Sequence, residues 1–198
     1  MEMPVAPATY ALIMANMLAS VIGLSIDRKF LETFAFQVGA IAQRKQHYRI
    51  FTSSFLHRDY LHLAFNMLTL LYFGPVVERL LGIDGFLVVY FGAVFASGVV
   101  AFYANRRNAA YASLGASDGV AGTVLAFCVF FPFEGVYIFF IPIAIPALLF
   151  GAIFILLSAL LMGRRGGRIA HESHLAGAIA GAGLTLAMRP DTLMRFFS

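Results

Sequence analysis

The chain has 198 residues, of which 61% are hydrophobic and 12% are charged, and its mean hydropathy is +0.84. Soluble domains carry about 25% charged residues. This composition therefore excludes a soluble domain and indicates an integral membrane protein. The net charge of +4 favours anchoring at a lipid surface over binding of nucleic acid. The length predicts a single domain over residues 1–198, and the lone Cys128 excludes a disulfide within the chain.

Six long apolar stretches are separated by polar segments, and we expect transmembrane helices at residues 6–25, 61–81, 85–104, 115–131, 138–162 and 173–188. Six helices of about 20 residues fit this length. The fold class predicted is therefore an all-α membrane protein, a compact six-transmembrane-helix bundle. The fifth helix is expected to carry Pro142 and Pro146 in its interior. Residues 30–42 are too few and too polar to span, which predicts a long, membrane-associated first loop at the interface.

Polar side chains gather at the starts of the second, fourth and sixth stretches. His57, His62 and Asn66 lie near the start of the second, Ser117 near that of the fourth and His174 near that of the sixth. In a bundle connected by hairpins, even-numbered helices all begin on the same side of the bilayer. These residues are therefore predicted to meet at one depth. Ionisable side chains are costly inside a membrane, which makes them candidates for function.

A serine and a histidine at one depth can hydrolyse a peptide bond. A serine hydroxyl is a weak nucleophile until a base takes its proton, and His174 is the best-placed base for Ser117. Each residue lies near two glycines spaced by four, a pattern that lets membrane helices approach closely: Gly115 and Gly119, and Gly177 and Gly181. The alternative interpretation is that Ser117 is only a small residue in a helix contact.

His62 and Asn66 are four residues apart and therefore share one helical face. Their side chains are able to donate hydrogen bonds to an oxyanion, often the largest contribution to catalysis of acyl transfer. The alternative is a pair that only joins two helices, worth about 0.6–2 kcal/mol. His57 lies off this face, so we expect it to make a structural hydrogen bond in the loop.

No neighbour is expected to orient His174, so the sequence favours a serine–histidine dyad. Asp118 is interpreted as a charge that is favourable at a helix start. A metal site is not favoured, because His171 and His174 are one residue too close for the H-E-x-x-H pattern. The sequence therefore predicts neither a metal nor another cofactor.

Five motifs, in order, resemble the rhomboid family of intramembrane serine proteases. Residues 48–57 (YRIFTSSFLH) are similar to the family's W-R-x-x-T-x-x-F-x-H, and residues 57–67 to its H-x-x-x-x-H-x-x-x-N-M. Glu78 and Gly82 match E-x-x-x-G, Ser117 falls on the G-x-S nucleophile, and residues 173–181 resemble A-H-x-x-G-x-x-x-G. The resemblance covers residues 48–183, nearly all of the chain.

The resemblance implies a six-helix bundle with a catalytic serine below the membrane surface in a water-filled cavity. It also implies substrates that are single-span or polytopic membrane proteins, cleaved near the outer ends of their helices. The first loop, residues 30–46, would be embedded in the membrane. A multi-pass protein of the bacterial plasma membrane is expected, with the lipid bilayer and protein substrates as its partners.

Roles follow from the resemblance residue by residue. Ser117 would be the nucleophile and His174 the general base and acid. The oxyanion hole would be formed by His62, Asn66 and the backbone N–H of Ser117. Four further residues would support the site: His57, Gly115, Gly177 and Glu78.

Four positions depart from the family pattern. Tyr48 replaces a tryptophan, and Ser173 replaces an alanine. Asp118 follows the serine where glycine is usual, and Ala121 stands where an aromatic side chain stacks under the histidine. Asp118 and Ala121 motivate a second hypothesis, a catalytically inactive rhomboid-like protein that binds membrane clients.

A third hypothesis is a small transporter that uses His171, Glu172 and His174 as a proton relay.

The orientation of the chain in the membrane is a separate question. With the N-terminus inside, most basic loop residues lie outside, against the positive-inside rule. The resemblance nevertheless places the N-terminus in the cytoplasm, and we follow it because part of that charge belongs to the folded first loop.

Overall fold

The computed structural model describes residues 5–137, 144–162 and 169–196 and is predominantly helical. In chain order the elements are α1 (Pro7–Val21) with a π-helical extension (Ile22–Ile26), α2 (Arg28–Phe34), β1 (Phe36–Gln37), α3 (Val38–Arg44), α4 (Arg49–Thr52), a 3-10 turn (Ser53–Phe55), α5 (Tyr60–Asn105), β2 (Ala112–Ser113), α6 (Ser117–Phe130), β3 (Gly135–Tyr137), β4 (Ala144–Pro146), α7 (Ala147–Met162), α8 (Ile169–Met188) and a 3-10 helix η3 (Pro190–Phe196).

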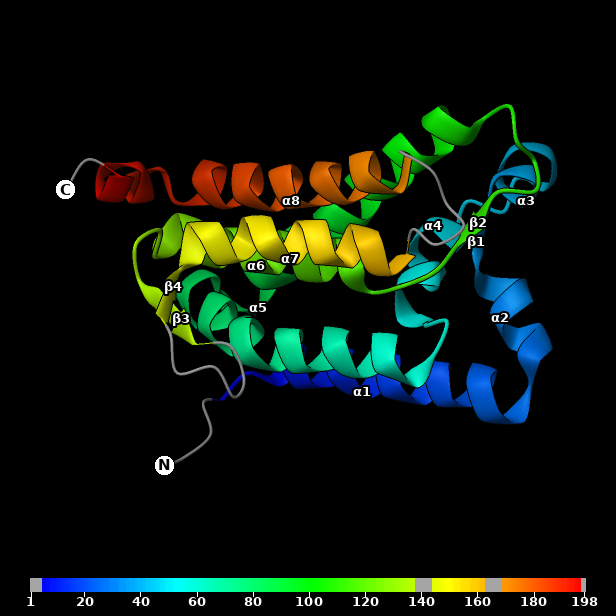
Figure 1. The fold of residues 1–198 in the computed structure, drawn as a ribbon, viewed down its shortest axis with the longest axis horizontal. Coiled ribbons are helices and arrows are strands. Elements are labelled where there is room, and N and C mark those ends of the chain that lie inside the picture. Colours follow the sequence, from blue (N-terminus) through cyan, green and yellow to red (C-terminus); the bar gives the residue numbers. More distant parts are fainter. Residues whose placement is uncertain (1–4, 138–143, 163–168, 197–198) are drawn as a thin grey trace.

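Helix α5 consists of two helices that meet at Gly82. This residue has a φ of 74°, which glycine adopts without a steric penalty, and the chain reverses there (Figure 1). The halves correspond to the predicted stretches 61–81 and 85–104.

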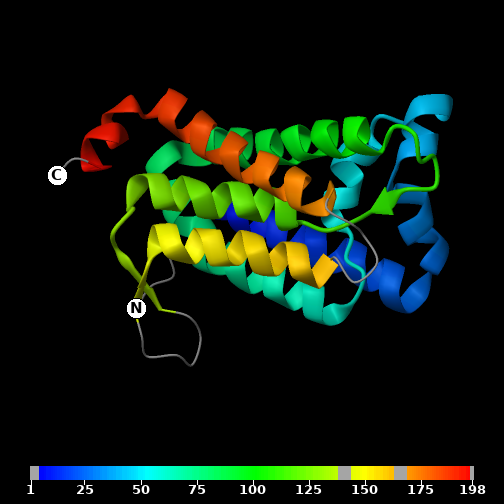
Figure 2. The same cartoon turned by 45° about the horizontal axis from the view of Figure 1, so that its top comes forward.

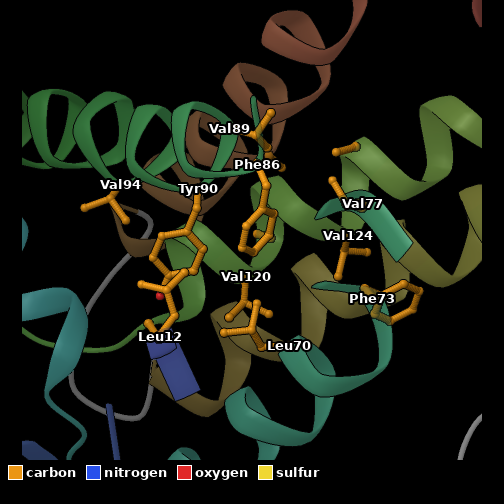
Figure 3. Close-up of a cluster of buried hydrophobic side chains, with 14 of the residues drawn as sticks. Leu12, Leu70, Phe73, Val77, Phe86, Val89, Tyr90, Val94, Val120 and Val124 are labelled. Carbon is orange, nitrogen blue, oxygen red and sulfur yellow. The ribbon is translucent and has the colours of Figure 1, made fainter. Parts of the chain in front are cut away.

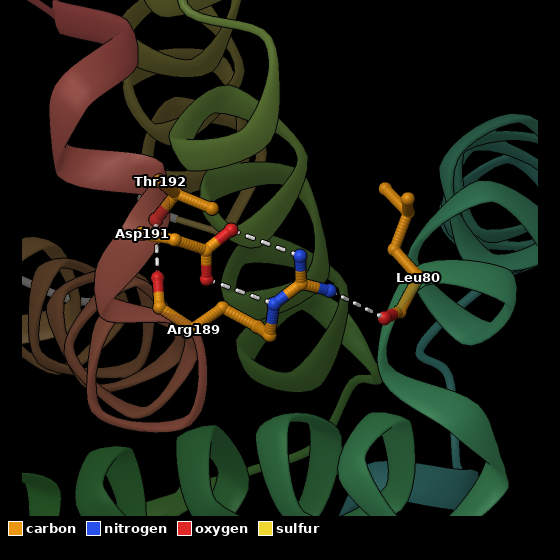
Figure 4. A network of polar contacts seen from close by, with 4 residues as sticks. All are labelled: Leu80, Arg189, Asp191 and Thr192. Atoms are coloured by element: carbon orange, nitrogen blue, oxygen red, sulfur yellow. Dashed lines mark hydrogen bonds and ion pairs between the residues drawn. The ribbon is translucent and has the colours of Figure 1, made fainter.

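The break in α5 leaves carbonyl groups of its first half without helical partners. Arg189, which is held by Asp191, donates from Nη1 to the carbonyl oxygen of Leu80 at 3.2 Å (Figure 4).

Helices α5, α6 and α8 contact one another at the centre of the bundle, with α1 against α5 and α7 against α6 and α8 (Figures 1 and 2). The starts of α5, α6 and α8 all lie at the end of the bundle where α2 and α3 are found (Figure 1). Among the described residues, Pro7–Ile26 and Tyr60–Asn105 are long and apolar enough to cross a membrane, and Ser117–Phe130 and Ser173–Met188 are shorter apolar helices.

The core between these helices is apolar and contains several aromatic rings (Figure 3). Phe73, Phe86 and Tyr90 of α5 are almost fully buried and lie beside Val120 and Val124 of α6. Many large apolar side chains instead remain exposed on the outside of α1, α5, α7 and α8. A water-soluble protein would hide such a surface, whereas a lipid environment accepts it.

Glu78 caps the start of α1. Its carboxylate is 3% exposed and accepts hydrogen bonds from the backbone N–H of Ala8 at 3.0 Å and of Thr9 at 2.8 Å, and from the Thr9 hydroxyl at 2.7 Å. A negative charge at a helix N-terminus is favourable because the first N–H groups there lack partners. The supporting role predicted for Glu78 is thus the attachment of α1 to α5.

The first loop is folded and is attached to the segment that precedes α6. Strand β1 pairs with β2, and the N–H of Gly39 donates to the carbonyl oxygen of Ala109 at 3.0 Å. Arg49 is buried and donates to the carbonyl oxygens of Glu32 and Ala35. This basic side chain therefore attaches α4 to the folded loop.

The prediction for the fifth helix was wrong at its start. The helix begins at Ala147, after an antiparallel hairpin in which Val136 of β3 pairs with Ile145 of β4. Pro146 lies in β4 and not in the helix interior. This position is favourable because proline lacks the N–H that a helix interior requires. Pro142 lies outside the described residues.

Candidate active site

Ser117 and His174 are in direct contact, although they are 57 residues apart in the sequence. Ser117 is the first residue of α6, and His174 lies near the start of α8, so both side chains project from the same end of the bundle. The Ser117 Oγ is 2.7 Å from Nε2 of His174. The two residues are 2% and 1% exposed. This is the geometry in which an imidazole is able to accept the hydroxyl proton.

Glycine residues allow α6 and α8 to approach so closely, and both members of the predicted pair Gly177 and Gly181 face α6, whereas Gly119 of the other pair does not face α8. A Cβ added to Gly181 would overlap the backbone of Gly122, so these two residues form the contact between the helices. Gly119 instead faces the ring of Tyr90. Gly177 also lies against α6, because a Cβ there would lie 3.1 Å from the carbonyl oxygen of Asp118.

Gly115 lies between His62 and Ser117, just before α6. Its φ of 148° is one that favours glycine, and a Cβ there would be 3.2 Å from His62 Nε2 and 3.4 Å from Ser117 Oγ. His62 is thereby beside the candidate nucleophile. Asn66 is 1% exposed, and its Nδ2 donates to the carbonyl oxygen of His62, one helical turn earlier. Asn66 therefore supports the helix turn that carries His62.

His57 connects α1 to the segment before Ser117, as the predicted structural role requires. Its Nδ1 is 2.8 Å from the hydroxyl of Ser20, which in turn donates to the carbonyl oxygen of Phe55. Because that hydroxyl proton is already used, Nδ1 of His57 donates, and Nε2 accepts from the N–H of Ala116 at 3.4 Å. Burial, followed by the nearby His62, lowers the pKa of His57 to about 3, which keeps the ring neutral.

This pKa predicts that stability falls as the pH is lowered. The unfolded chain binds a proton at His57 near pH 6.5, but the folded protein binds it only near pH 3. The stabilisation is complete above about pH 6.5 and is lost toward pH 3, by up to about 1.4 kcal/mol per pH unit. Thermal midpoints between pH 7 and 4 should show this slope, His57→Gln should flatten it, and the exposed His47→Gln should keep it. An unchanged slope in His57→Gln would contradict the assignment.

Asp118 lies in the first turn of α6, as predicted, and it also contacts His174. Its Oδ1 lies 3.5 Å from Nδ1 of His174, on the side of the ring opposite Ser117. An acidic side chain therefore lies beside His174. Adjacent residues at a helix start point in different directions, and sequence alone does not show that a histidine ring fits between them. The acidic side chain beside the nucleophile was the available signal.

A cavity opens at this site. Its lining includes Ser117, Asp118, His174 and Gly115, together with hydroxyl groups of the 3-10 turn and β2. Such a polar space is suited to hold a peptide carbonyl and a water molecule next to the serine. The structure thus brings together Ser117, His174, His62, His57 and Gly115. The side chains of His171 and Glu172, invoked for a proton relay, lie outside the described residues.

The chain is similar to known proteins of one family. The rhomboid domain model matches residues 44–191. Rhomboid protein 1, mitochondrial, of Saccharomyces cerevisiae is 28% identical over 135 residues, which cover 67% of this chain and 39% of that protein. Rhomboid protease GluP of Bacillus subtilis is 32% identical over 100 residues, which cover 50% of this chain and 19% of that protein. The chain thus matches less than half the length of each relative. Because the family model covers more than half of the chain, the protein belongs to the rhomboid family of membrane-embedded proteins.

Proposed function

We propose that the protein is an intramembrane serine protease that cleaves peptide bonds in or near the transmembrane segments of other membrane proteins. The observation that carries this proposal is the 2.7 Å contact between Ser117 Oγ and His174 Nε2 beside a polar cavity. A relative named as a rhomboid protease supports the reaction class. No cofactor and no metal ion is required for this chemistry.

The proposed reaction has two steps. His174 takes the hydroxyl proton while Ser117 Oγ attacks the peptide carbonyl, and the protonated imidazole then gives that proton to the leaving amine. Water hydrolyses the resulting acyl-enzyme by the reverse sequence of proton transfers. The developing oxyanion would be held by His62 and by the N–H of Ser117, which is free of helical partners because α6 begins there. We also assign Asn66 to this oxyanion hole, because its side chain donates a hydrogen bond to the backbone carbonyl of His62.

We propose that the bundle crosses the membrane six times, through α1, the two halves of α5, α6, α7 and α8. The cavity at the starts of α5, α6 and α8 then lies toward one membrane surface, and single-span or polytopic substrates reach it from the bilayer. A bacterial plasma membrane is the proposed location, although one relative is named as mitochondrial.

The decisive experiment is labelling of the purified protein with a fluorophosphonate probe. An activated serine reacts with this probe, whereas an ordinary hydroxyl does not. We expect labelling that maps to Ser117 and is lost in both Ser117→Ala and His174→Ala. A folded wild-type protein that is not labelled would instead support an inactive rhomboid-like protein that binds membrane clients.

Removal of the His62 side chain should slow turnover without loss of the nucleophile. His62→Ala is expected to lower kcat by about 10²–10³-fold, the usual cost of one oxyanion donor. The KM should change much less, because an oxyanion exists only in the transition state. Cleavage kinetics of a single-span substrate measure both constants, and a change confined to KM would assign His62 to substrate binding.

A further inference from the structure

Asp118 has no role in the two-residue mechanism proposed above, yet its carboxylate lies beside the active ring. The His174 imidazole stands between two neighbours, with Nε2 at 2.7 Å from Ser117 Oγ and Nδ1 at 3.5 Å from Asp118 Oδ1. Both neighbours belong to the first turn of α6. One helix start therefore determines what each nitrogen of the ring contacts.

The Asp118 carboxylate is only partly open to solvent. The Asp118 side chain as a whole is 25% exposed and lines the cavity, but Oδ1 is shielded from solvent. Within the described part of the chain, this oxygen makes no hydrogen bond. A buried carboxylate oxygen without a donor is costly, so a purely structural role would be served better by a neutral residue. Nδ1 of His174, at 3.5 Å, is able to offset this cost.

We propose that Asp118 is a positioning residue that extends the Ser117–His174 pair to a Ser–His–Asp arrangement; this inference rests on the proteolytic function proposed above. A neutral imidazole has one N–H, and a carboxylate beside Nδ1 favours the proton on that nitrogen. The lone pair of Nε2 is then directed at the Ser117 hydroxyl. When the ring takes the serine proton, the carboxylate also stabilises the positive charge, an effect that is strong in a site with little water.

Contacts with neighbouring residues hold the Asp118 carboxylate beside His174. The side chain of Ser97, on α5, also contacts the Asp118 carboxylate and donates a hydrogen bond to the carbonyl oxygen of Ser173, next to His174. Gly177 leaves room for the Ser97 side chain, because a Cβ there would lie 2.8 Å from Ser97 Oγ. The separation of 3.5 Å exceeds a normal hydrogen bond, and such contacts commonly shorten when the ring becomes charged in a reacting complex.

The test compares Asp118→Asn, Asp118→Glu and Ser117→Ala in cleavage of a purified single-span substrate. Asp118→Asn is expected to lower kcat by about 10–10²-fold with little change in KM, because the carboxylate acts on the proton transfer and not on substrate binding. Asp118→Glu, which keeps the charge, should recover part of that loss. Asp84→Asn is the matched control, since Asp84 is an exposed acidic residue at the start of the second half of α5. It should leave kcat unchanged.

Thermal midpoints separate positioning from folding. The inference requires that Asp118→Asn unfolds within a few degrees of the wild type while its kcat is reduced. Wild-type kcat in Asp118→Asn, or a loss equal to that of Asp84→Asn, would overturn it. If Ser117→Ala abolishes cleavage but Asp118→Asn does not slow it, only the Asp118 inference fails. If Ser117→Ala still cleaves at the wild-type rate, the proteolytic function itself fails.

Discussion

Replacement of Ser117 or His174 by alanine is expected to lower cleavage of a single-span membrane substrate by at least about 10³-fold. In the proposed mechanism Ser117 supplies the oxygen that forms the acyl-enzyme, and His174 lies within hydrogen-bond distance of that oxygen. Because the two act as a unit, the double variant should be no slower than either single variant. Product formation in detergent or in liposomes, followed over hours, measures all three.

Ser113→Ala provides the matched control for this loss. Ser113 lines the same cavity but belongs to β2, where it pairs with Phe36. We expect this variant to cleave at nearly the wild-type rate. Cleavage by Ser117→Ala at a rate equal to that of Ser113→Ala would mean that another group performs the chemistry.

Substitution of Gly181 by alanine is expected to destabilise the protein by about 1–3 kcal/mol and to reduce activity at the same time. The new methyl group would overlap the backbone of Gly122, which cannot rotate away as a side chain does. Helices α6 and α8 would therefore separate. Because His174 lies on α8 and Ser117 on α6, the same displacement would lengthen their hydrogen bond.

The same substitution at Gly183, two residues later on α8, should have the opposite effect. Gly183 is exposed, and a Cβ there would meet no atom within 4 Å. Alanine is favoured over glycine inside a helix by about 0.5–1 kcal/mol, so Gly183→Ala should maintain or raise the thermal midpoint. Equal midpoints for Gly181→Ala and Gly183→Ala would exclude the close helix contact.

The position of Ser117, His174 and His62 at one end of the bundle was predictable, because it depends only on the direction of successive helices. Alternate helices in a hairpin-connected bundle start at the same end, and the apolar stretches were clear enough to count. The structural role of His57 was predictable for a related reason, since it lies outside the helical face shared by His62 and Asn66. These inferences required no knowledge of how any helix is rotated about its axis.

Helix rotation and local backbone turns could not be predicted. The sequence offers glycines at several spacings along α6, and the choice of Gly122 over Gly119 depends on where the ring of Tyr90 fits. Whether Asp118 faces His174 or solvent is decided by the same rotation. The hairpin before α7 was missed because its strands are as apolar as a helix, and periodicity does not separate the two in short segments.

Helix α1 precedes residue 44, where the match to the family begins, yet two of its residues hold polar side chains of the matched segment. Ser20 holds the ring of His57, and Thr9 supplies two of the three donors around Glu78. A shortened protein limited to residues 44–191 would lack the hydrogen-bond donors of α1 around the Glu78 carboxylate. It would also lack the Ser20 hydroxyl that contacts the His57 ring. The smallest version that keeps both sets of contacts is therefore longer than the part that sequence similarity alone would delimit.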